Sequence, residues 1–535
     1  FYDGRLAPTE FPTPQAFWLE LDGQLLASDW EWAGLEKLPA PTPGGVHAAV
    51  TLRHAARPVT VRVHTLLDGS PVLTRWLEVT NTGERPAALA AACPWSGGLQ
   101  KIARWRSHLG ETGRALYSLG YFANTHWGDE GHFQWFDLPS AGYRVDGRYR
   151  RDRHRHPMFV LRNNATGEHW IGQLAWSGGY SFEFDLDADL GTLDQAARLS
   201  FRAGPDAPAP QRIIAPGEMV STPELHLGMV FGDLDAAIQA MHDHLRRSVF
   251  MPQPRGRGGW IESGIGPEIE ITAEDVVHAL DAAAEIGAEV FFIDASWYAP
   301  PRSNWWNTVG DWQVDLTRFP EGIGPFRERA HAKGMLFGLW MDAERIAVHS
   351  QIRQAHPEWV AVAYDGQQRL GDLLDLTNPA AAAWMEEQIA RVIAENEIEF
   401  FRLDHNVGGL GMGAKIVRDG YVENHYWRYH EALYAIYERL RARFPDVIFE
   451  NCAGGGGRTD LGMVRRFSHT WVTDWQIAPR SFSITNGMTM ALPPEVVDRL
   501  LGGQSGHTAA EFDFQARLLL FVRPTFGFTY PLGAQ

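Results

Sequence analysis

Cysteine is almost absent from the sequence. Its 535 residues include only two, Cys93 and Cys452, which lie far apart and in what look like different domains. Such a pair excludes a disulfide framework and a metal site built from several cysteines. The histidines, His405 among them, are scattered without ligand spacing, so we expect neither a metal nor another cofactor.

Long apolar runs and excess positive charge are also missing. No run approaches the ~20 apolar residues of a membrane-spanning helix. The 48 basic and 65 acidic residues give a formal charge of −17, and a chain of that sign is not attracted to nucleic acid or to an anionic membrane. We therefore expect neither as a partner.

The first residues carry no targeting signal. The sequence begins at Phe1, without a Met or a signal-like segment. Removal of a signal or leader would leave the same start, so a cytoplasmic and a secreted location both stay open.

Aromatic residues, in contrast, are plentiful. The chain has 21 Trp and 28 Phe, and hydrophobic residues make up 45% of it, which is typical of a globular protein. Spare tryptophan is frequent where proteins bind sugars. At roughly 150 residues per domain, the length predicts two to four domains.

Short alternating segments dominate from about residue 17 to residue 225. Apolar and polar residues alternate at 59–64, 73–79, 169–174 and 180–185, and Gly, Asn and Pro separate the runs. A period of two with such punctuation predicts an antiparallel β-sandwich. We find no catalytic constellation inside it.

A change of pattern near residue 250 predicts a domain boundary. Residues 234–250 have apolar side chains at helical spacing and arginines near the end, where they suit the helix dipole. Pro252, Pro254 and three glycines follow. We expect a β-sandwich over 1–232, a linker helix over 233–256 and a catalytic domain over 257–535.

Helices and apolar strands alternate in this last part. Predicted helices at 276–286, 325–333, 380–395 and 426–444 are each followed or preceded by an apolar strand, at 289–294, 335–340, 399–404 and 447–450. No glycine-rich phosphate turn follows the first strand, and the late run 452–458 lacks the ending of a P-loop. The pattern favours a (β/α)8 TIM barrel over a doubly wound sheet, so the fold class is multidomain α/β.

Three of the predicted barrel strands end on a carboxylate. The strands are 289–294, 399–404 and 468–474, and they close on Asp294, Asp404 and Asp474. Catalytic side chains of such barrels lie at the C-terminal ends of the strands, a rule that also selects Trp340 and Cys452. The sequence predicts one site there, although a helix N-cap is the alternative for any single aspartate.

Two carboxylates that face each other across a sugar are the minimal apparatus for cleaving a glycoside. One attacks the anomeric carbon, and the other donates a proton to the leaving oxygen. A retaining enzyme holds them ~5–5.5 Å apart, which neighbouring strands of a small barrel provide.

Several longer motifs carry a family resemblance. In order and spacing they resemble the α-galactosidases of glycoside hydrolase family 36, retaining enzymes with a β-sandwich before the barrel. The motifs are Ile-Asp-Ala-Ser-Trp-Tyr (293–298), Gly-Asp-Trp-Gln-Val-Asp (310–315), Gly-Met-Leu-Phe-Gly-Leu-Trp (334–340), His-Pro-Glu-Trp (356–359), Arg-Leu-Asp-His-Asn (402–406), Glu-Asn-Cys-Ala-Gly-Gly-Gly-Gly-Arg-Thr-Asp (450–460) and Thr-Asp (473–474). Residues 176–182 and 216–224 resemble that family's N-terminal domain.

The resemblance implies roles for matched positions. Asp404 stands at the family's nucleophile position and Asp474 at its acid/base position. Asp294 matches the first of two adjacent aspartates that bind sugar hydroxyls, and Trp340 matches the tryptophan beneath the sugar. Arg402, two residues before Asp404 on one strand face, favours the ionised form of the nucleophile.

Further residues complete the expected substrate site. Cys452 and Arg458 match the family's cysteine-glycine-arginine motif, and Asn406 lies in the nucleophile motif. Trp475 flanks the acid/base. Asp311 and Trp312 follow the Asp294 strand, and either face the sugar or pin the loop.

Departures from the family pattern fall at positions that are expected to bind the sugar hydroxyl groups. Ala295 replaces the second aspartate, Arg402 replaces a lysine, Val407 replaces an arginine, and Trp475 interrupts the acid/base motif. Loss of a buried hydrogen-bonding partner can cost orders of magnitude against a former substrate. The first expectation is hydrolysis of terminal α-galactosides; an α-N-acetylgalactosaminide, or a sugar altered at C6 such as a β-L-arabinopyranoside, is the alternative.

Two other activities stay open. A transglycosidase would use Trp305, Trp306 and Trp475 as an acceptor site, and a non-catalytic protein would only bind the sugar. The family normally continues into a C-terminal β-domain, which is absent or not included here, and it is often oligomeric. We expect a carbohydrate substrate and allow for a homo-oligomer.

Overall fold

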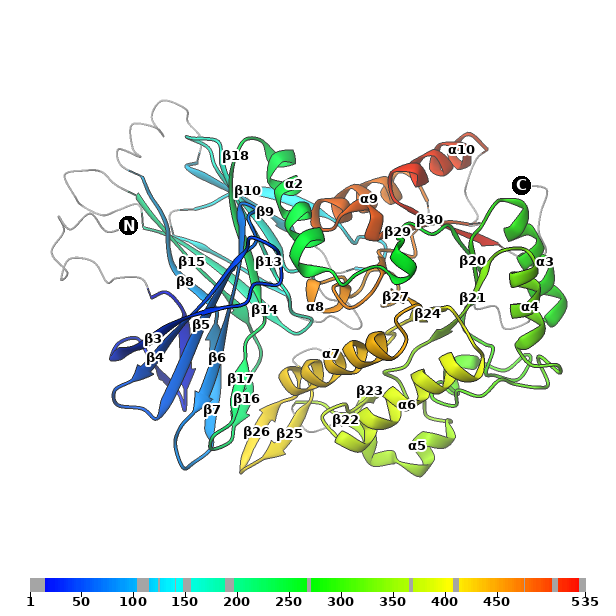
Figure 1. Cartoon of the computed structure of the whole chain (residues 1–535), viewed down its shortest axis with the longest axis horizontal. Coiled ribbons are helices and arrows are strands. Elements are labelled where there is room, and N and C mark those ends of the chain that lie inside the picture. Colours follow the sequence, from blue (N-terminus) through cyan, green and yellow to red (C-terminus); the bar gives the residue numbers. More distant parts are fainter. Residues whose placement is uncertain are drawn as a thin grey trace.

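The computed structural model describes residues 15–102, 115–123, 126–139, 141–147, 155–187, 197–266, 271–364, 369–407, 413–475, 477–502 and 509–528. Antiparallel sheets form the first half of the chain and a closed parallel barrel the second, side by side in Figure 1. The predicted fold class, a β-sandwich followed by a (β/α)8 barrel, is confirmed.

The largest sheet of the first half is antiparallel, with the path β10-β9-β12-β13-β18-β6-β5-β4-β3 and β17 added on β6. Its strands are β3 (Trp30–Leu38), β4 (Val46–His54), β5 (Val59–Leu67), β6 (Val72–Asn81), β9 (Tyr117–Phe122), β10 (Phe133–Asp137), β12 (Met158–Asn163), β13 (Glu168–Leu174), β17 (Met219–Ser221) and β18 (Leu225–Phe231). The alternation at 59–64 places Val59, Val61 and Val63 in the core.

Two smaller sheets complete this half. One has the order β16-β7-β1-β2 and the other β11-β14-β15-β8. Their strands are β1 (Trp18–Leu21), β2 (Gln24–Leu25), β7 (Ala87–Cys93), β8 (Trp95–Ile102), β11 (Tyr143–Gly147), β14 (Tyr180–Asp187), β15 (Ala197–Pro205) and β16 (Arg212–Ile214). Phe159 of β12 packs against Phe182, Phe184 and Phe201 with ring centroids 5.1 Å apart, so aromatic side chains join two sheets.

A helix joins the two halves. α2 (Leu234–His244) begins at Asp233, whose side chain accepts a hydrogen bond from the Ala236 N–H. The predicted helix ran to 250; instead, the last turn widens into a π-helical turn, η1 (Leu245–Val249), in which Phe250 N–H bonds to the Leu245 carbonyl. A short 3-10 turn, η2 (Pro254–Gly256), follows. We propose 1–232, 233–256 and 257–535 as the domain limits.

Eight parallel strands close the barrel. In order around it they are β19 (Glu262–Ile265), β20 (Val290–Ile293), β21 (Leu336–Met341), β24 (Phe400–Leu403), β27 (Ile448–Asn451), β28 (His469–Trp471), β29 (Val497–Leu501) and β30 (Arg523–Phe528). β30 pairs with β19, with Thr525 opposite Glu262. Their C-terminal ends therefore meet at one rim.

Helices follow most of these strands. They are α3 (Ala273–Glu285), α4 (Gly324–Ala332), α5 (Gln351–Ala355), α6 (Pro379–Glu395), α7 (Tyr426–Arg443), α8 (Leu461–Val464), α9 (Arg480–Ala491) and α10 (Ala509–Leu518), with 3-10 turns η3 (Trp305–Asn307), η4 (Pro357–Trp359), η5 (Pro494–Val496) and η6 (Leu519–Phe521). Two hairpins, β22 (Val360–Val362) with β23 (Arg369–Leu374) and β25 (Lys415–Arg418) with β26 (Tyr421–Asn424), decorate the barrel. Thr272 caps α3 in a capping box with Asp275. No helix in the described ranges is long and apolar enough to span a bilayer.

Candidate active site

The strand ends bring the three predicted aspartates together. Asp294 follows β20, Asp404 follows β24, and Asp474 lies three residues after β28. The charges of Asp404 and Asp474 both raise the pKa of Asp294, so the three carboxyl groups lie near one another. The single site predicted at the strand ends is therefore a cluster of three carboxyl groups.

Asp404 is held by N–H donors on several sides. Its Oδ1 accepts hydrogen bonds from the backbone N–H groups of His405 and Gly454, both at 2.8 Å. Its Oδ2 accepts from the Trp340 indole Nε1 at 3.2 Å. These donors fix the orientation of the carboxylate and balance a negative charge.

The glycine run after Cys452 joins Asp404 to Asp474. Gly454 donates to Asp404, and Gly455 packs against Asp474: a Cβ on Gly455 would lie 2.8 Å from the Asp474 backbone nitrogen and 3.2 Å from its Cγ. Gly455 also has a φ of +85°, which disfavours other residues. The run brings two strand ends into contact.

Asp474 accepts hydrogen bonds from two indoles. Trp471 Nε1 donates to Oδ1 at 2.9 Å, and Trp127 Nε1 donates to Oδ2 at 2.9 Å. Trp127 belongs to the sandwich half of the chain, 347 residues away. Sequence reasoning missed it, because no motif around Trp127 sets it apart from the many other tryptophans.

Burial perturbs the Asp294 carboxyl group. Burial raises its pKa to about 6, although Arg402 opposes the shift. The backbone N–H of Ala295 donates to its Oδ1 at 2.8 Å, and Arg402 Nε lies 3.7 Å from its Oδ2. Ser296, two residues on, has a φ of +85°, a strained conformation of the kind that collects at functional sites.

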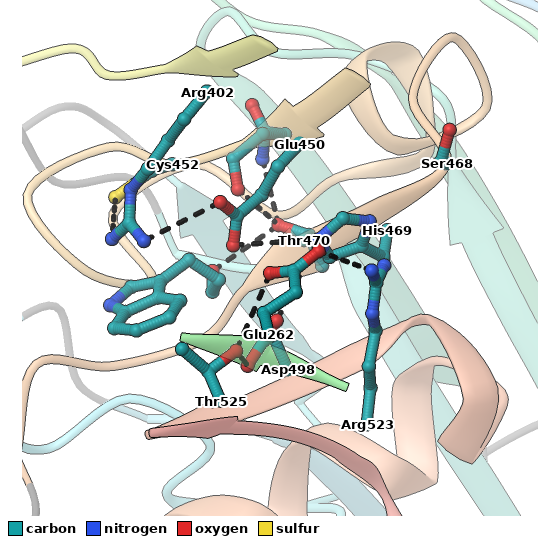
Figure 2. A network of polar contacts seen from close by, with 12 residues as sticks. Glu262, Arg402, Glu450, Cys452, Ser468, His469, Thr470, Asp498, Arg523 and Thr525 are labelled. Carbon is teal, nitrogen blue, oxygen red and sulfur yellow. Dashed lines mark hydrogen bonds and ion pairs between the residues drawn. The ribbon is translucent and has the colours of Figure 1, made fainter. Parts of the chain in front are cut away.

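Arg402 spans the floor of the site. Figure 2 shows its guanidinium between Cys452 and Glu450: NH2 lies 4.0 Å from the cysteine Sγ and NH1 lies 3.4 Å from Glu450 Oε2. The same group lies flat on Trp471, 3.9 Å from the ring centre. Burial raises the pKa of the Cys452 thiol, which therefore stays neutral.

A buried polar cluster lies below Arg402, inside the barrel. Its four side chains, which offer ligand atoms within 4.8 Å of one another, are Glu262, Glu450, His469 and Asp498. Arg523 pairs with Glu262, and Arg402 faces Glu450. Burial and Arg523 lower the pKa of His469, but the carboxylates of Glu262 and Glu450 outweigh them, and the pKa is raised. Burial and the neighbouring Glu262 and Glu450 raise the pKa of Asp498 well above its usual value, and Arg402 and Arg523 already supply two positive charges to this cluster, so we assign no metal.

Aromatic rings line the site beside Trp340. Tyr298 lies parallel to Trp340 with ring centroids 6.4 Å apart, and Trp312 meets Tyr298 edge-on at 4.8 Å. Trp312 is buried, and within the described ranges its Nε1 meets no acceptor. An orphaned indole N–H next to Trp340 suits a sugar hydroxyl.

Asp311 and Arg458 make structural contacts. Both Asp311 oxygens accept from the Gln351 N–H at 2.9 Å, which anchors the start of α5. Arg458 forms a buried, two-pronged ion pair with Glu344, with NH1 3.0 Å from Oε2 and NH2 2.5 Å from Oε1. Their contact with substrate stays a prediction.

Two acids after β21 were not predicted. Asn406 Nδ2 donates to Asp342 Oδ2 at 3.3 Å, and burial raises the pKa of Asp342 well above its usual value. Glu344 is also buried, yet Arg458 and His405 lower its pKa to about 2. They lie on the loop after the strand that ends in Trp340 and Met341, a strand end of the kind that revealed the other acids.

Comparison with known proteins decides the family. A profile of the Melibiase family matches residues 220–529, more than half of the chain. The chain belongs to the Melibiase family. All of the site residues except Trp127 lie in the Melibiase match.

Two curated relatives of this Melibiase chain are α-galactosidases. The chain is 27% identical over 449 residues to α-galactosidase 1 of Pediococcus pentosaceus, a match that covers 80% of this chain and 57% of the relative. It is 25% identical over 395 residues to the α-galactosidase of Escherichia coli, covering 72% of this chain and 53% of the relative. The chain thus spans about half the length of the curated relatives it matches.

Solved structures agree on the fold. The family 36 α-galactosidase AgaB of Geobacillus stearothermophilus superposes with a TM-score of 0.83 at 21% identity, covering 97% of this chain and 73% of that structure. A complex of the related AgaA variant A355E D548N with raffinose superposes with a TM-score of 0.83 at 20% identity, covering 97% of this chain and 73% of that one. The resemblance of this Melibiase chain to glycoside hydrolase family 36 is confirmed.

Proposed function

We propose that the protein is a retaining glycoside hydrolase that removes terminal α-galactosyl residues from oligosaccharides or glycoconjugates. The observation that carries the proposal is the glycine run that holds two carboxylates together: Gly454 donates to Asp404 while Gly455 packs against Asp474. Retaining hydrolysis needs such a pair facing one anomeric carbon. The α-galactosidase relatives, from Pediococcus and Escherichia coli, support the choice of sugar.

Asp404 is the proposed nucleophile. Its carboxylate attacks the anomeric carbon, the glycosidic bond breaks with its electrons on the leaving oxygen, and a glycosyl ester of Asp404 forms. Donors on both oxygens, from Trp340 and from the His405 and Gly454 backbone, orient the attacking lone pair.

Asp474 is the proposed acid/base. In the first step its proton passes to the leaving oxygen. In the second step the resulting carboxylate takes a proton from water, whose oxygen attacks the anomeric carbon; the bond between that carbon and Asp404 breaks, which releases the sugar and restores the Asp404 carboxylate. The hydrogen bond from Trp471 to Oδ1 holds this carboxyl group in position.

The remaining polar groups would bind the hydroxyl groups of the sugar. Asp294 and Arg402 offer an acceptor and a set of donors on one side, and Trp312 offers a free indole N–H within the described ranges. Trp340 would lie beneath the ring. Raffinose, bound by the AgaA variant, is the type of substrate that we propose for this chain.

A second candidate is the same chemistry on a sugar altered at C6. Ala295 is buried and contributes no carboxylate next to Asp294. Arg402, which lies 3.4 Å from Glu450 and over the Trp471 ring, offers only N–H donors and cannot replace that acceptor. A β-L-arabinopyranoside lacks the group that the missing aspartate would bind.

The test is turnover of a panel of 4-nitrophenyl glycosides, with Asp404→Asn as control. We expect the wild type to release nitrophenol from the α-galactoside with retention of configuration, and Asp404→Asn to lose at least about 10³-fold in kcat. A wild type that prefers the β-L-arabinopyranoside or the α-N-acetylgalactosaminide would replace the sugar and keep the machinery. Transfer products at high sugar would indicate a transglycosidase. Binding without turnover of any glycoside would refute the proposal.

A further inference from the structure

A loop of the sandwich half packs against the proposed acid/base segment. Residues 126–132 lie between β9 and β10, and Glu130 Oε2 accepts a hydrogen bond from Thr473 Oγ1 at 2.8 Å. A Cβ on Gly131 would lie 2.5 Å from the Ile484 carbonyl oxygen of α9. The glycines thus allow a close approach, and the loop is held on both sides of Asp474.

Trp127 projects from this loop onto Asp474. Its Nε1 donates to Oδ2 at 2.9 Å, and its ring meets that of Trp475 edge-to-face, with centroids 5.6 Å apart. A Cβ on Gly128 would lie 2.8 Å from the Trp475 ring, so glycine is what allows this contact. Trp475 is itself fixed by a bond from its Nε1 to the Ile477 carbonyl at 2.9 Å.

The two oxygens of Asp474 face different surroundings. Oδ1 is bonded to Trp471, which is buried under the Arg402 guanidinium. Oδ2 is bonded to Trp127, whose side chain is 47% exposed. A leaving group comes from solvent, so the oxygen it can reach is Oδ2.

A leaving oxygen at Oδ2 competes with the bond seen there. The Trp127 indole can only donate, and a carboxyl oxygen that carries the proton for the leaving oxygen is a weaker acceptor than a carboxylate oxygen. While substrate is bound, the Trp127 N–H therefore needs a second acceptor, and the hydroxyl groups of a leaving-group sugar are acceptors of that kind.

We infer that Trp127, held in place by Trp475, forms the binding site for the leaving-group sugar, a pyranose ring that packs on its exposed indole. As its glycosidic oxygen takes the place of the Trp127 N–H at Oδ2, that N–H turns to a hydroxyl of the bound sugar. After proton transfer and departure of the sugar, the Asp474 carboxylate accepts the Trp127 N–H again. This inference rests on the proposed function and deepens it: the substrate class is oligosaccharides, in which a second sugar follows the cleaved bond.

The test compares two substrates that share the galactosyl group. α-Galactosyl fluoride has no second sugar and its leaving group needs little protonation, whereas melibiose has a glucose as leaving group. Trp127→Ala removes ring and donor, and Trp127→Phe keeps the ring and removes the donor. Trp32→Ala is the matched control, because Trp32 is 65% exposed on β3.

We expect Trp127→Ala to lower kcat/KM for melibiose by about tenfold or more, as loss of a stacked ring and a hydrogen bond predicts. The same variant should stay within about twofold of the wild type on the fluoride, with Trp127→Phe intermediate on melibiose and Trp32→Ala unchanged on both.

Two results would overturn the inference while the proposed function stands: an equal loss on both substrates, which indicates a role in shaping the site as a whole, or no loss on melibiose. A wild type that cleaves neither the fluoride nor melibiose would overturn the proposed function, and this inference with it.

Discussion

The Arg402 guanidinium lies 3.9 Å from the centre of the Trp471 ring, and Trp471 Nε1 donates to Asp474 at 2.9 Å. A cation on the face of an indole polarises its N–H and strengthens it as a donor. We therefore expect Arg402 to act, through Trp471, on the proposed acid/base Asp474.

Arg402→Lys tests this arrangement. Lysine keeps the charge, but a single ammonium cannot lie flat on Trp471 and reach both Glu450 and Asp294. We expect kcat/KM for the preferred glycoside to fall about tenfold, in line with a cation–π contact of about 1–2 kcal/mol. Arg439→Lys, at an exposed pair with Glu386, is the control and should leave kcat/KM unchanged. Equal values for wild type and Arg402→Lys would show that the guanidinium plane has no role.

The buried cluster below Arg402 predicts a large stability effect. Glu450 is fully buried and faces Arg402 and His469 at 3.4 and 3.5 Å. Glu450→Gln leaves both without their shared counter-charge, so the free energy of unfolding should fall by about 3–5 kcal/mol. Urea denaturation measures it, and Glu386→Gln at the surface should cost at most about 1 kcal/mol. A loss at Glu450 no larger than at Glu386 would mean that the cluster is not an ionic network.

Asp294 predicts a pH dependence of both stability and activity. Burial raises its pKa to about 6, so the folded protein binds this proton more tightly than the unfolded chain does. Its contribution to stability is full below about pH 4 and is lost as the pH rises through 6. Asp294→Asn should therefore stabilise the protein by about 2–3 kcal/mol at pH 7 and by little at pH 4.

The activity should move in the opposite direction. Below pH 6 Asp294 is neutral and no longer accepts from sugar hydroxyls as a carboxylate, so kcat/KM should decrease as the pH falls through 6. Asp294→Asn should have low activity, and its kcat/KM should not decrease as the pH falls through 6. A wild-type profile that is flat between pH 5 and 7, or a limb that persists in Asp294→Asn, would assign the titration to another group.

Strand ends could be predicted from the sequence because the information is local. Apolar runs that stop at Asp294, Asp404 and Asp474 identify parallel strands, and parallel strands of one barrel end at one rim. The barrel and the cluster of carboxylates follow from that rule. Asp342 obeys the same rule, since it directly follows β21, but the predicted strand stopped at Trp340 and Asp342 was missed.

Other contacts could not be predicted, because they depend on packing between distant segments. Trp127 reaches Asp474 only because the sandwich loop packs against the barrel, and no sequence motif near Trp127 indicates this contact. Glu262 and Asp498 interrupt strands that would be apolar in most barrels, so their position inside the barrel is visible only once β19 and β29 are paired with β30.

Gly455 offers the sharpest test of how the two carboxylates are held together. An alanine there would clash with the Asp474 backbone at 2.8 Å and would adopt a φ of +85°. Gly322 has a similar φ of +75° with nothing within 4 Å of an added Cβ, so Gly322→Ala isolates the cost of backbone strain. We expect Gly322→Ala to lose about 1–2 kcal/mol of stability from backbone strain, and Gly455→Ala to lose more because the clash adds to the strain. Only Gly455→Ala should also lose about 10²-fold or more in kcat, because a shift of about 1 Å in a catalytic group has that effect. If Gly455→Ala keeps its kcat, or Gly322→Ala loses as much, the glycine run does not position Asp474.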